Sequence, residues 1–284
     1  MLKNTFRHLP NCSAAKEQKL WAAGITSWEA LLQSDPQKLS RQHGTLYAQS
    51  IEESFKQLEY NNPNYFADLL SSKEHWRFFP DFRHSIAYLD IETTGLNYGD
   101  TITTIALYDG SRIFYYIKGE NLNDFMRDIE RYSLIVTYNG KCFDVPFIER
   151  YFKIKIPHAH IDLMYVLRSL GYRGGLKGCE RQLGLQRGEL DGVDGFFAVL
   201  LWKDYQKNKN PKSLETLLAY NIQDVVNLET LLTIAYNKKI SETPFAERNL
   251  LPRPQDPQVP FHADEATIKR LQHQKAFSWS YGWR

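Results

Sequence analysis

Cysteine is scarce in this 284-residue chain, and the three cysteines that occur form no pairing motif. Cys12, Cys142 and Cys179 are odd in number, lie far apart and include no CxxC. Disulfide scaffolds, structural zinc sites and iron–sulfur clusters need paired or clustered cysteines, so this pattern argues against all three. So few thiols suit a reducing compartment, and we expect a cytoplasmic location.

Long apolar runs are also absent. The sequence has no stretch of about 18 apolar residues, the length that spans a bilayer, so we expect no membrane segment. Its start, MLKNTFRHLP, contains no apolar segment typical of a secretion signal. The net charge of +2 is too small for a polybasic coat, so any binding of nucleic acid must depend on local patches.

Three regions follow one another along the chain. Residues 1–80 have the pattern of short helices, residues 84–240 alternate strand and helix patterns, and residues 241–284 are rich in proline and polar residues. We expect a helical N-terminal region, a central α/β domain and a flexible C-terminal tail. The first region is similar to a helix-hairpin-helix. The usual Gly-x-Gly hairpin is replaced by NCS at positions 11–13, so a plain helical cap stays open as the alternative.

The central region predicts a mixed sheet with helices on both faces. SIAYLDIE, TITTIALYD and SRIFYYIKG have strand patterns, and an Asp-Gly turn joins the last two as a hairpin. The strand SLIVTYNG then alternates with helical segments, and a long amphipathic helix begins near Pro211. Three antiparallel strands followed by alternating helices and parallel strands indicate a ribonuclease H-like α/β fold.

Two acids stand on the first predicted strand. Asp90 and Glu92 are two residues apart, so both side chains lie on the same face. Two acids on one face of a buried strand repel each other and lose hydration unless a cation lies between them. The alternative is a strand end at which both acids reach water.

Two more acids follow later in the chain. Asp144 comes directly after a strand, where it could face a ligand crevice or cap the next helix. Tyr220 and Asp224 are four apart on the long helix and share a face. Apolar neighbours place that face against the core, where an unpaired carboxylate is costly. A solvated helix edge is the alternative.

Together, YLDIETTGL, YNGKCFDVPF and YNIQD resemble the three motifs of DEDD-superfamily 3′–5′ exonucleases, in particular the YprB-like bacterial family. The resemblance covers residues 84–235. It implies that Asp90, Glu92, Asp144 and Asp224 bind two divalent cations, Mg²⁺ or Mn²⁺. The position five before the last acid is alanine, so the match is to the tyrosine subclass, in which Tyr220 orients the attacking water.

The same resemblance implies a set of substrate contacts. In related exonucleases the loop after the first acid pair holds the 3′ end of the substrate, and a leucine wedges between the last bases. Here that loop contains Thr93, Gly95 and Leu96. Asn139 and Phe143 match the asparagine and the aromatic residue that precede the second-motif acid. An ordinary turn is the alternative for both segments.

Other polar segments leave alternatives open. His158, His160 and Asp162 alternate and would share a face of an extended segment. They could form a separate metal site, hydrogen-bond to the ligands of the acid site, or include a histidine that faces solvent. Asp162 is also a spare candidate for the acid set. A basic stretch follows and could line a phosphate groove or a solvated helix face. It consists of Arg168, Arg173, Lys177, Arg181 and Arg187.

The sequence therefore predicts a two-metal nuclease with nucleic acid as its partner, acting as a 3′–5′ exonuclease on single-stranded DNA or RNA ends. A metal-dependent endonuclease or structure-specific nuclease keeps the same residues. A nucleic-acid-binding module on an inactive nuclease fold is the alternative from another class. The presence of all four acids argues against it.

Overall fold

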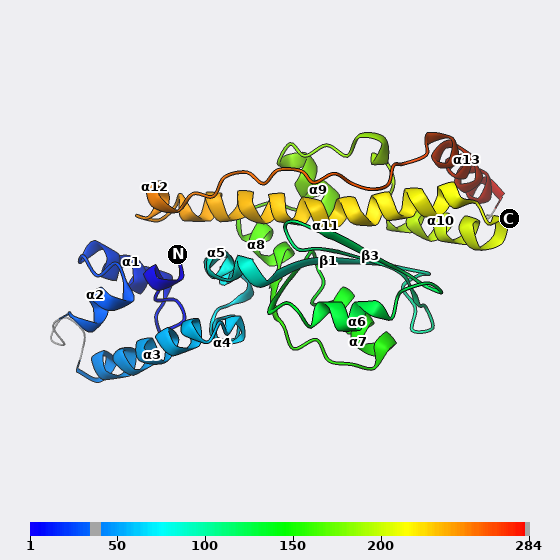
Figure 1. The fold of residues 1–284 in the computed structure, drawn as a ribbon. Helices are drawn as coiled ribbons and strands as arrows, with labels where there is room; N and C mark the ends of the chain where they lie inside the picture. The colour runs from blue at the N-terminus through cyan, green and yellow to red at the C-terminus, as the bar shows by residue number, and fades with distance from the viewer. Residues whose placement is uncertain (35–40, 282–284) are drawn as a thin grey trace.

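The structure is a computed structural model that describes residues 1–34 and 41–281. Figure 1 shows a mixed sheet between helical layers, with further helices grouped at the N-terminal end. In the described part of the chain the sheet has five strands, in the order β3-β2-β1-β4-β5. The strands are β1 (Ile86–Thr93), β2 (Ile102–Tyr108), β3 (Ile113–Ile117), β4 (Leu134–Thr137) and β5 (Ala159–Asp162).

Strand pairing confirms the predicted ribonuclease H-like α/β sheet. β1, β2 and β3 form an antiparallel meander, and β4 and β5 continue the sheet on the other side of β1 as parallel strands. The register of β1 against β2 shifts between Glu92 and Thr93. Such a bulge bends a strand and redirects its side chains, here at the point where β1 ends.

Helices occur before, between and after the strands. The segments before the sheet are η1 (Leu2–Asn4), α1 (Ala14–Ala22), α2 (Trp28–Leu32), α3 (Arg41–Glu59), α4 (Pro63–Leu69), η3 (Ser72–Arg77), α5 (Phe79–Phe82) and η4 (Arg83–Ser85). The later segments are α6 (Asp124–Ile129), α7 (Asp144–Phe152), α8 (Leu163–Ser169), α9 (Gly175–Gln182), η5 (Gly188–Leu190), α10 (Gly195–Asn208), α11 (Pro211–Ile240), α12 (Ala246–Asn249) and α13 (Glu265–Tyr281). No described helix is long and apolar enough to cross a bilayer.

Alternating side chains of β1 face two different helical layers. Leu89 and Ile91 belong to the apolar cluster that contains α6 and α7, whereas Tyr88 belongs to the one that contains α11. Figure 1 shows these two layers on opposite sides of the sheet. Asp90 and Glu92 follow Tyr88 at two-residue spacing and therefore point toward α11.

The long helix α11 is the main support of this face. Asn210 caps its start by accepting a hydrogen bond from the Lys212 amide, and Pro211 occupies its first turn. Its 30 residues extend about 45 Å. The helix passes across β1 and β2, so a residue near its middle can reach the end of β1.

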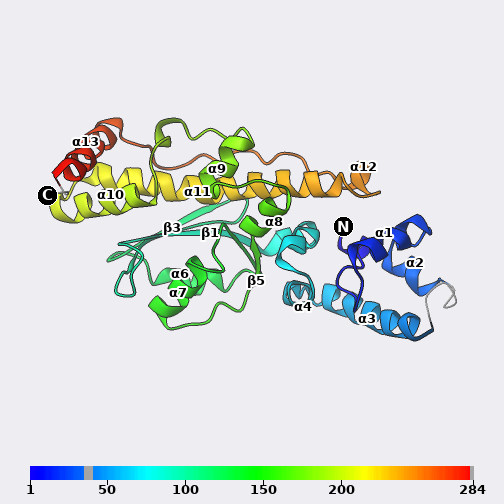
Figure 2. The same cartoon turned by 180° about the vertical axis from the view of Figure 1, so that it is seen from behind.

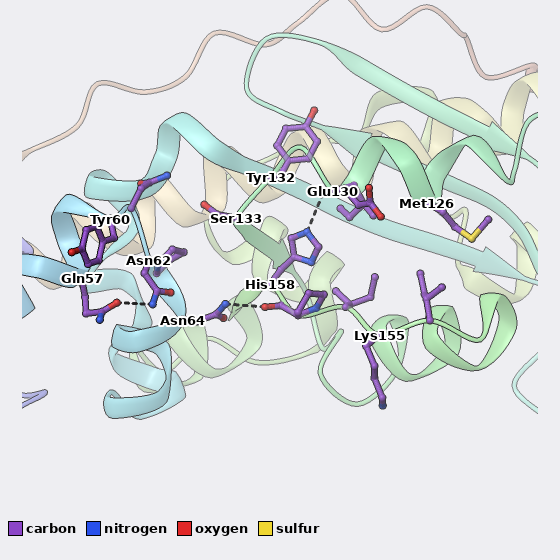
Figure 3. A pocket seen from close by; sticks show the side chains of 16 residues that line it. Gln57, Tyr60, Asn62, Asn64, Met126, Glu130, Tyr132, Ser133, Lys155 and His158 are labelled. Carbon is purple, nitrogen blue, oxygen red and sulfur yellow. Dashed lines mark hydrogen bonds between the residues drawn. The ribbon is translucent and has the colours of Figure 1, made fainter.

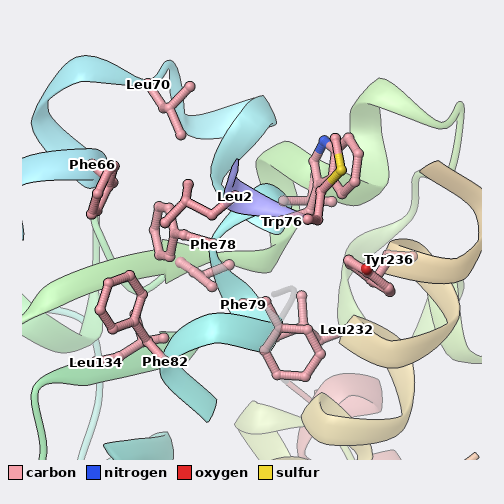
Figure 4. Close-up of a cluster of buried hydrophobic side chains, with 14 of the residues drawn as sticks. Leu2, Phe66, Leu70, Trp76, Phe78, Phe79, Phe82, Leu134, Leu232 and Tyr236 are labelled. Atoms are coloured by element: carbon pink, nitrogen blue, oxygen red, sulfur yellow. The ribbon is translucent and has the colours of Figure 1, made fainter. Parts of the chain in front are cut away.

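The N-terminal helices pack on the sheet domain through an aromatic cluster (Figure 4). The rings of Phe66 in α4 and Phe82 in α5 are 5.9 Å apart, and Trp76 of η3 lies 5.8 Å from Tyr236 of α11. Leu134 of β4 lies in the same cluster. Because residues of both regions belong to this one cluster, the two regions share a hydrophobic core. Each buried aromatic side chain in it removes about 150–250 Å² of surface from water.

Two histidines, the buried His8 and the half-buried His160, are neutral side chains at pH 7. His8 lies against Trp28 and Phe66, and His160 Nε2 is 2.8 Å from Thr137 Oγ1. Burial is the main cause that lowers the pKa of each histidine to about 3, and nearby cationic side chains lower it further.

We expect the free energy of unfolding to fall as the pH is lowered from 6.5 to 5. Unfolded histidines bind protons below their ordinary pKa of 6.5, whereas these folded ones do so only near pH 3, so protons favour the unfolded chain throughout this window. Each histidine contributes about 1.4 kcal/mol per pH unit. Urea titrations at several pH values measure how steeply the free energy of unfolding changes with pH. His8→Phe should reduce this slope by the contribution of one histidine. A variant with the wild-type slope would contradict the assignment.

Of the predicted flexible tail at residues 241–284, the structure describes residues 241–281, and residues 282–284 lie outside the described part of the chain. After α12 the chain runs back along α11 (Figure 2), and Asn237 of α11 forms two hydrogen bonds with the backbone of Leu251. Arg270 of α13 then pairs with Asp204 of α10. These contacts could not be predicted from the sequence pattern, because each joins the segment to a distant part of the chain.

Candidate active site

A pocket of about 610 Å³ opens at the end of β1. Its walls are the last residues of β1, the loop that follows, and the facing sides of α10 and α11. β1 runs parallel to β4, and ligands of open α/β sheets bind at the carboxyl ends of such strands. The pocket therefore lies where this fold places a ligand.

Three carboxylates converge in the pocket. One oxygen from each of Asp90, Glu92 and Asp224 lies within 4.8 Å of the others. The period of β1 turns the first two toward α11, and the middle of α11 brings Asp224 to them. The structure thus brings together three of the four acids that the sequence singled out.

Burial and mutual repulsion disfavour the charged form of these acids. Burial is the largest cause that raises the pKa of Asp90, Glu92 and Asp224, and neighbouring carboxylates raise the pKa further. All the candidate ligand atoms are oxygens. A divalent cation would compensate their charge at ordinary ligand distances, so the site fits a hard cation such as Mg²⁺ or Mn²⁺.

Asp144 lies beside the backbone of β1. It is the first residue of α7, and Phe143 occupies the N-cap position, so Asp144 is not the N-cap that the sequence offered as an alternative. Its Oδ1 accepts a hydrogen bond from the Ile91 amide at 3.3 Å. Burial raises the pKa of Asp144 to about 7, and its charge in turn raises the pKa of Asp90 and Glu92. Asp144 lies outside the 4.8 Å group of the three acids.

Asn221 orients Asp90. Its side-chain amide donates to Asp90 Oδ2 at 2.7 Å, and its carbonyl oxygen accepts from Thr104 Oγ1 at 3.0 Å. This residue is fully buried on α11 and did not enter the prediction from sequence. A lone asparagine between apolar neighbours, next to Tyr220, was the signal that could have found it.

Tyr220 lines the same pocket and is 4% exposed. Burial is the first cause that raises the pKa of its phenol far above the ordinary value, and Asp224, Glu92 and Asp90 add to it. The Lys177 ammonium lies 4.4 Å from the centre of its ring. The hydroxyl therefore stays protonated at neutral pH.

The loop after β1 is held by a carboxylate that the sequence did not indicate. Asp100 accepts hydrogen bonds from Thr94 Oγ1 at 2.8 Å and from the Asn97 amide at 2.7 Å. A Cβ at Gly95 would lie 2.6 Å from Asp100 Oδ2, so a larger residue there would have to displace the carboxylate that holds the loop. Leu96 is 82% exposed at the mouth of the pocket.

The other proposed substrate contacts are divided between two pockets. Thr93, Gly95, Leu96 and Phe143 line the acid pocket. Asn139 instead lines a neighbouring pocket of about 370 Å³. Its backbone has a φ of 65°, and its amide donates to Asp162.

The segment that contains two histidines and Asp162 has structural partners. Asp162 accepts hydrogen bonds from the Asn139, Lys141 and Met164 amides, which fixes the loop after β4 and caps α8. His158 contacts a backbone carbonyl, and His160 contacts Thr137. Among the described residues these side chains form no metal-ligating group.

The basic stretch is not one surface. Lys177 and Arg187 turn inward and lie beside the acids, where Arg187 Nη2 is 2.5 Å from Asp224 Oδ1. Arg168 and Arg173 line the pocket of Asn139. The sequence showed the basic character of this stretch, but the direction of each side chain depends on how α9 packs.

A second large cavity, of about 660 Å³, lies away from the acids. Figure 3 shows it between the α3–α4 connection and the segments around Tyr132 and His158. Its labelled side chains are mostly amides and aromatics, and His158 is bonded to the Ile129 carbonyl. Its lining contains one acid, Glu130, and so lacks the carboxylate cluster of the pocket at the end of β1.

A family model described as the RNase_H superfamily matches residues 87–236, more than half of the chain. The chain belongs to the RNase_H superfamily. The match spans β1 to α11 and contains all four acids. Membership in this superfamily supports a hydrolase that acts on nucleic acid, in agreement with the nuclease that the sequence predicts.

Two individual proteins resemble this chain. YprB of Bacillus subtilis (strain 168), described as an uncharacterized protein, is 29% identical over 186 residues, which cover 57% of this chain and 44% of YprB. The chain thus matches less than half of the length of that relative. The family B DNA polymerase of Pyrobaculum calidifontis is 17% identical with a TM-score of 0.42, over 55% of this chain and 24% of the polymerase.

Proposed function

We propose that this RNase_H-superfamily chain is a metal-dependent nuclease that removes nucleotides from the 3′ ends of single-stranded DNA or RNA. The observation that carries the proposal is the convergence of Asp90, Glu92 and Asp224 within 4.8 Å in the β1 pocket. With Asp144 they bring a charge of about −4, which suits two Mg²⁺ or Mn²⁺ ions. The 3′–5′ polarity comes from the resemblance of the three sequence motifs to DEDD-superfamily exonucleases.

The residues of the pocket would have distinct roles. Cations bound by the acids would activate the attacking water and neutralise negative charge on the phosphodiester that is cleaved. Asn221 holds Asp90 in place through its amide. Tyr220 keeps its proton because its pKa is far above neutral, so it would orient the attacking water by hydrogen bonding and not act as a base.

The mouth of the pocket suits the end of a nucleic-acid strand. Leu96 is 82% exposed and Phe196 of α10 is 52% exposed, and both line the pocket. Exposed apolar and aromatic side chains provide surfaces on which unpaired bases stack. Lys203 lies at the same pocket and would contact a backbone phosphate. A 3′-terminal nucleotide could therefore be held with its phosphate near the acids.

Tyr220→Phe should lower the rate of cleavage and leave cation binding unchanged. The change removes only the hydroxyl, and loss of one positioned hydrogen-bonding group costs about 10²-fold in turnover. Single-turnover cleavage measures the rate, and a Mn²⁺ titration measures the affinity. A variant that loses affinity for Mn²⁺ would show that Tyr220 supports the cation site and does not orient water.

The first experiment is a cleavage assay on 5′-labelled single-stranded DNA and RNA, with Mg²⁺, Mn²⁺ or EDTA. Asp90→Ala is the inactive control. A metal-dependent ladder that shortens from the 3′ end, and that the control lacks, is the expected result and would also identify the preferred nucleic acid.

Other products would change the assignment. Discrete internal cuts that the control lacks would indicate an endonuclease with the same acids. Binding in a gel-shift assay without cleavage would favour a nucleic-acid-binding module on an inactive fold.

We also infer that the chain works in a reducing compartment, as expected for the cytoplasm. Cys12, Cys142 and Cys179 are all free thiols. Oxidising compartments favour paired cysteines, so three free thiols are in keeping with this location.

A further inference from the structure

Arg187 connects Asp224 to a second buried carboxylate. The Arg187 side chain is only 4% exposed, and its Nη2 lies 2.5 Å from Asp224 Oδ1. Nε and Nη2 also donate to the two oxygens of Glu180, at 2.6 and 2.7 Å. Glu180 is 1% exposed. One guanidinium therefore bridges two buried acids, of which only Asp224 belongs to the cation site.

Glu180 is fixed in turn by α11. Asn227 donates to Glu180 Oε1 at 2.7 Å, and Gln223 donates to Asn227 Oδ1 at 2.8 Å. Asn227 is three residues after Asp224, so the two side chains share a face of the helix. The network thus starts and ends on α11 and passes through Glu180 of α9 and through Arg187, which directly precedes η5. These contacts leave Arg187 little freedom to move.

The net charge around Arg187 decides whether Arg187 supports cation binding at Asp224 or competes with the cation. A lone buried guanidinium beside Asp224 would repel a divalent cation and compete with it for the carboxylate. Here Glu180 already forms a two-point ion pair with Arg187, and that pair has no net charge. Arg187 can therefore remain in contact with Asp224 while the carboxylate binds a cation.

We propose that Arg187 is a positioning residue of the cation site, which holds the Asp224 carboxylate in its binding orientation and is itself held by Glu180 and Asn227. This inference rests on the proposed function, because it takes Asp224 as a cation ligand. The competing role is a counter-ion that the cation must displace. The two roles predict opposite changes in cation affinity when Arg187 is removed.

The test is the affinity of the full-length chain for Mn²⁺, measured by isothermal titration calorimetry without nucleic acid. Arg187→Met should weaken binding by about 10–100-fold, the usual effect of removing a group that orients a metal ligand. Tighter binding would show a displaceable counter-ion and overturn the proposal. Arg181→Met, at an exposed position of the neighbouring α9, is the matched control and should bind Mn²⁺ as the wild type does.

Arg187→Lys separates charge from geometry and serves if the methionine variant does not fold. Lysine keeps the charge but cannot hold Glu180 and Asp224 together, so binding should again weaken. Wild-type affinity in a folded variant, even one with a lower melting temperature, would reduce Arg187 to a structural role and overturn the proposal. If the wild type binds no Mn²⁺, the cation site and the proposed function fail as well. Mn²⁺ binding that Arg187 does not affect overturns this inference alone.

Discussion

Asp224→Asn is expected to weaken cation binding and to reduce nucleic-acid cleavage by at least about 10³-fold. Asp224 supplies one of the three converging carboxylates, and a neutral amide offers a cation no charge. A bound cation contributes several kcal/mol of charge stabilisation in the transition state, and a loss of about 4 kcal/mol corresponds to a factor of about 10³. Asn is nearly isosteric with Asp, so the packing of α11 should persist.

Two measurements separate this effect from general damage. Mn²⁺ titration should show weaker binding, whereas Tyr220→Phe should bind as the wild type does, so the two variants isolate cation binding from water orientation. Asp191→Asn, at an exposed acid outside the pocket, is the matched control and should cleave at the wild-type rate. Full activity of Asp224→Asn would show that the acid cluster is not the catalytic centre.

Arg77→Met is expected to destabilise the fold by about 3–5 kcal/mol, because it leaves a buried carboxylate without its counter-ion. Arg77 is 5% exposed and its Nη2 lies 3.0 Å from Glu17 Oε2. Glu17, on α1, is 1% exposed and also accepts hydrogen bonds from Thr5 and the Phe6 amide. The ion pair thus ties the first helix to η3, which packs on α11.

Denaturant titration with a double-mutant cycle measures this coupling. Arg77→Met combined with Glu17→Gln should recover part of the lost stability, since the most deeply buried carboxylate is then neutral. The recovery is only partial because Arg77 also pairs with Glu74, at 2.7 Å. Arg127→Met is the control, because Arg127 is 74% exposed and its surface ion pairs contribute at most about 1 kcal/mol. If Arg77→Met is no more destabilising than the control, the buried pair does not hold the N-terminal region in place.

Much of the fold was predictable because the sequence patterns that indicate its strands, turns and helices lie within short segments of the chain. Period-2 alternation and the turn at Asp109-Gly110 indicated the meander, and the helical pattern after Pro211 indicated α11. The path of residues 241–281 was not predictable. Its proline and polar composition resembles that of a disordered tail, and its order comes from contacts with distant partners such as the Arg270–Asp204 pair.

The acids were predictable for the same reason. Asp90 and Glu92 share a face by the geometry of a strand, and Tyr220 and Asp224 share a face by the geometry of a helix. The sequence by itself therefore determined which acids and which tyrosine face the site, as well as the mixed sheet that carries them.

Only the tertiary structure decided what surrounds those acids. Lys177 and Arg187 looked like part of a basic surface, and nothing in the sequence indicated a role for Glu180. In the structure the side chains of Glu180 on α9 and of Arg187 after it are buried against α11, and Lys177 is half-buried beside Tyr220. Strand and helix periods fix the face on which a side chain lies, but they do not fix which distant element packs against that face. Ion pairs across that packing, such as Arg187 with Asp224, depend on the complete fold.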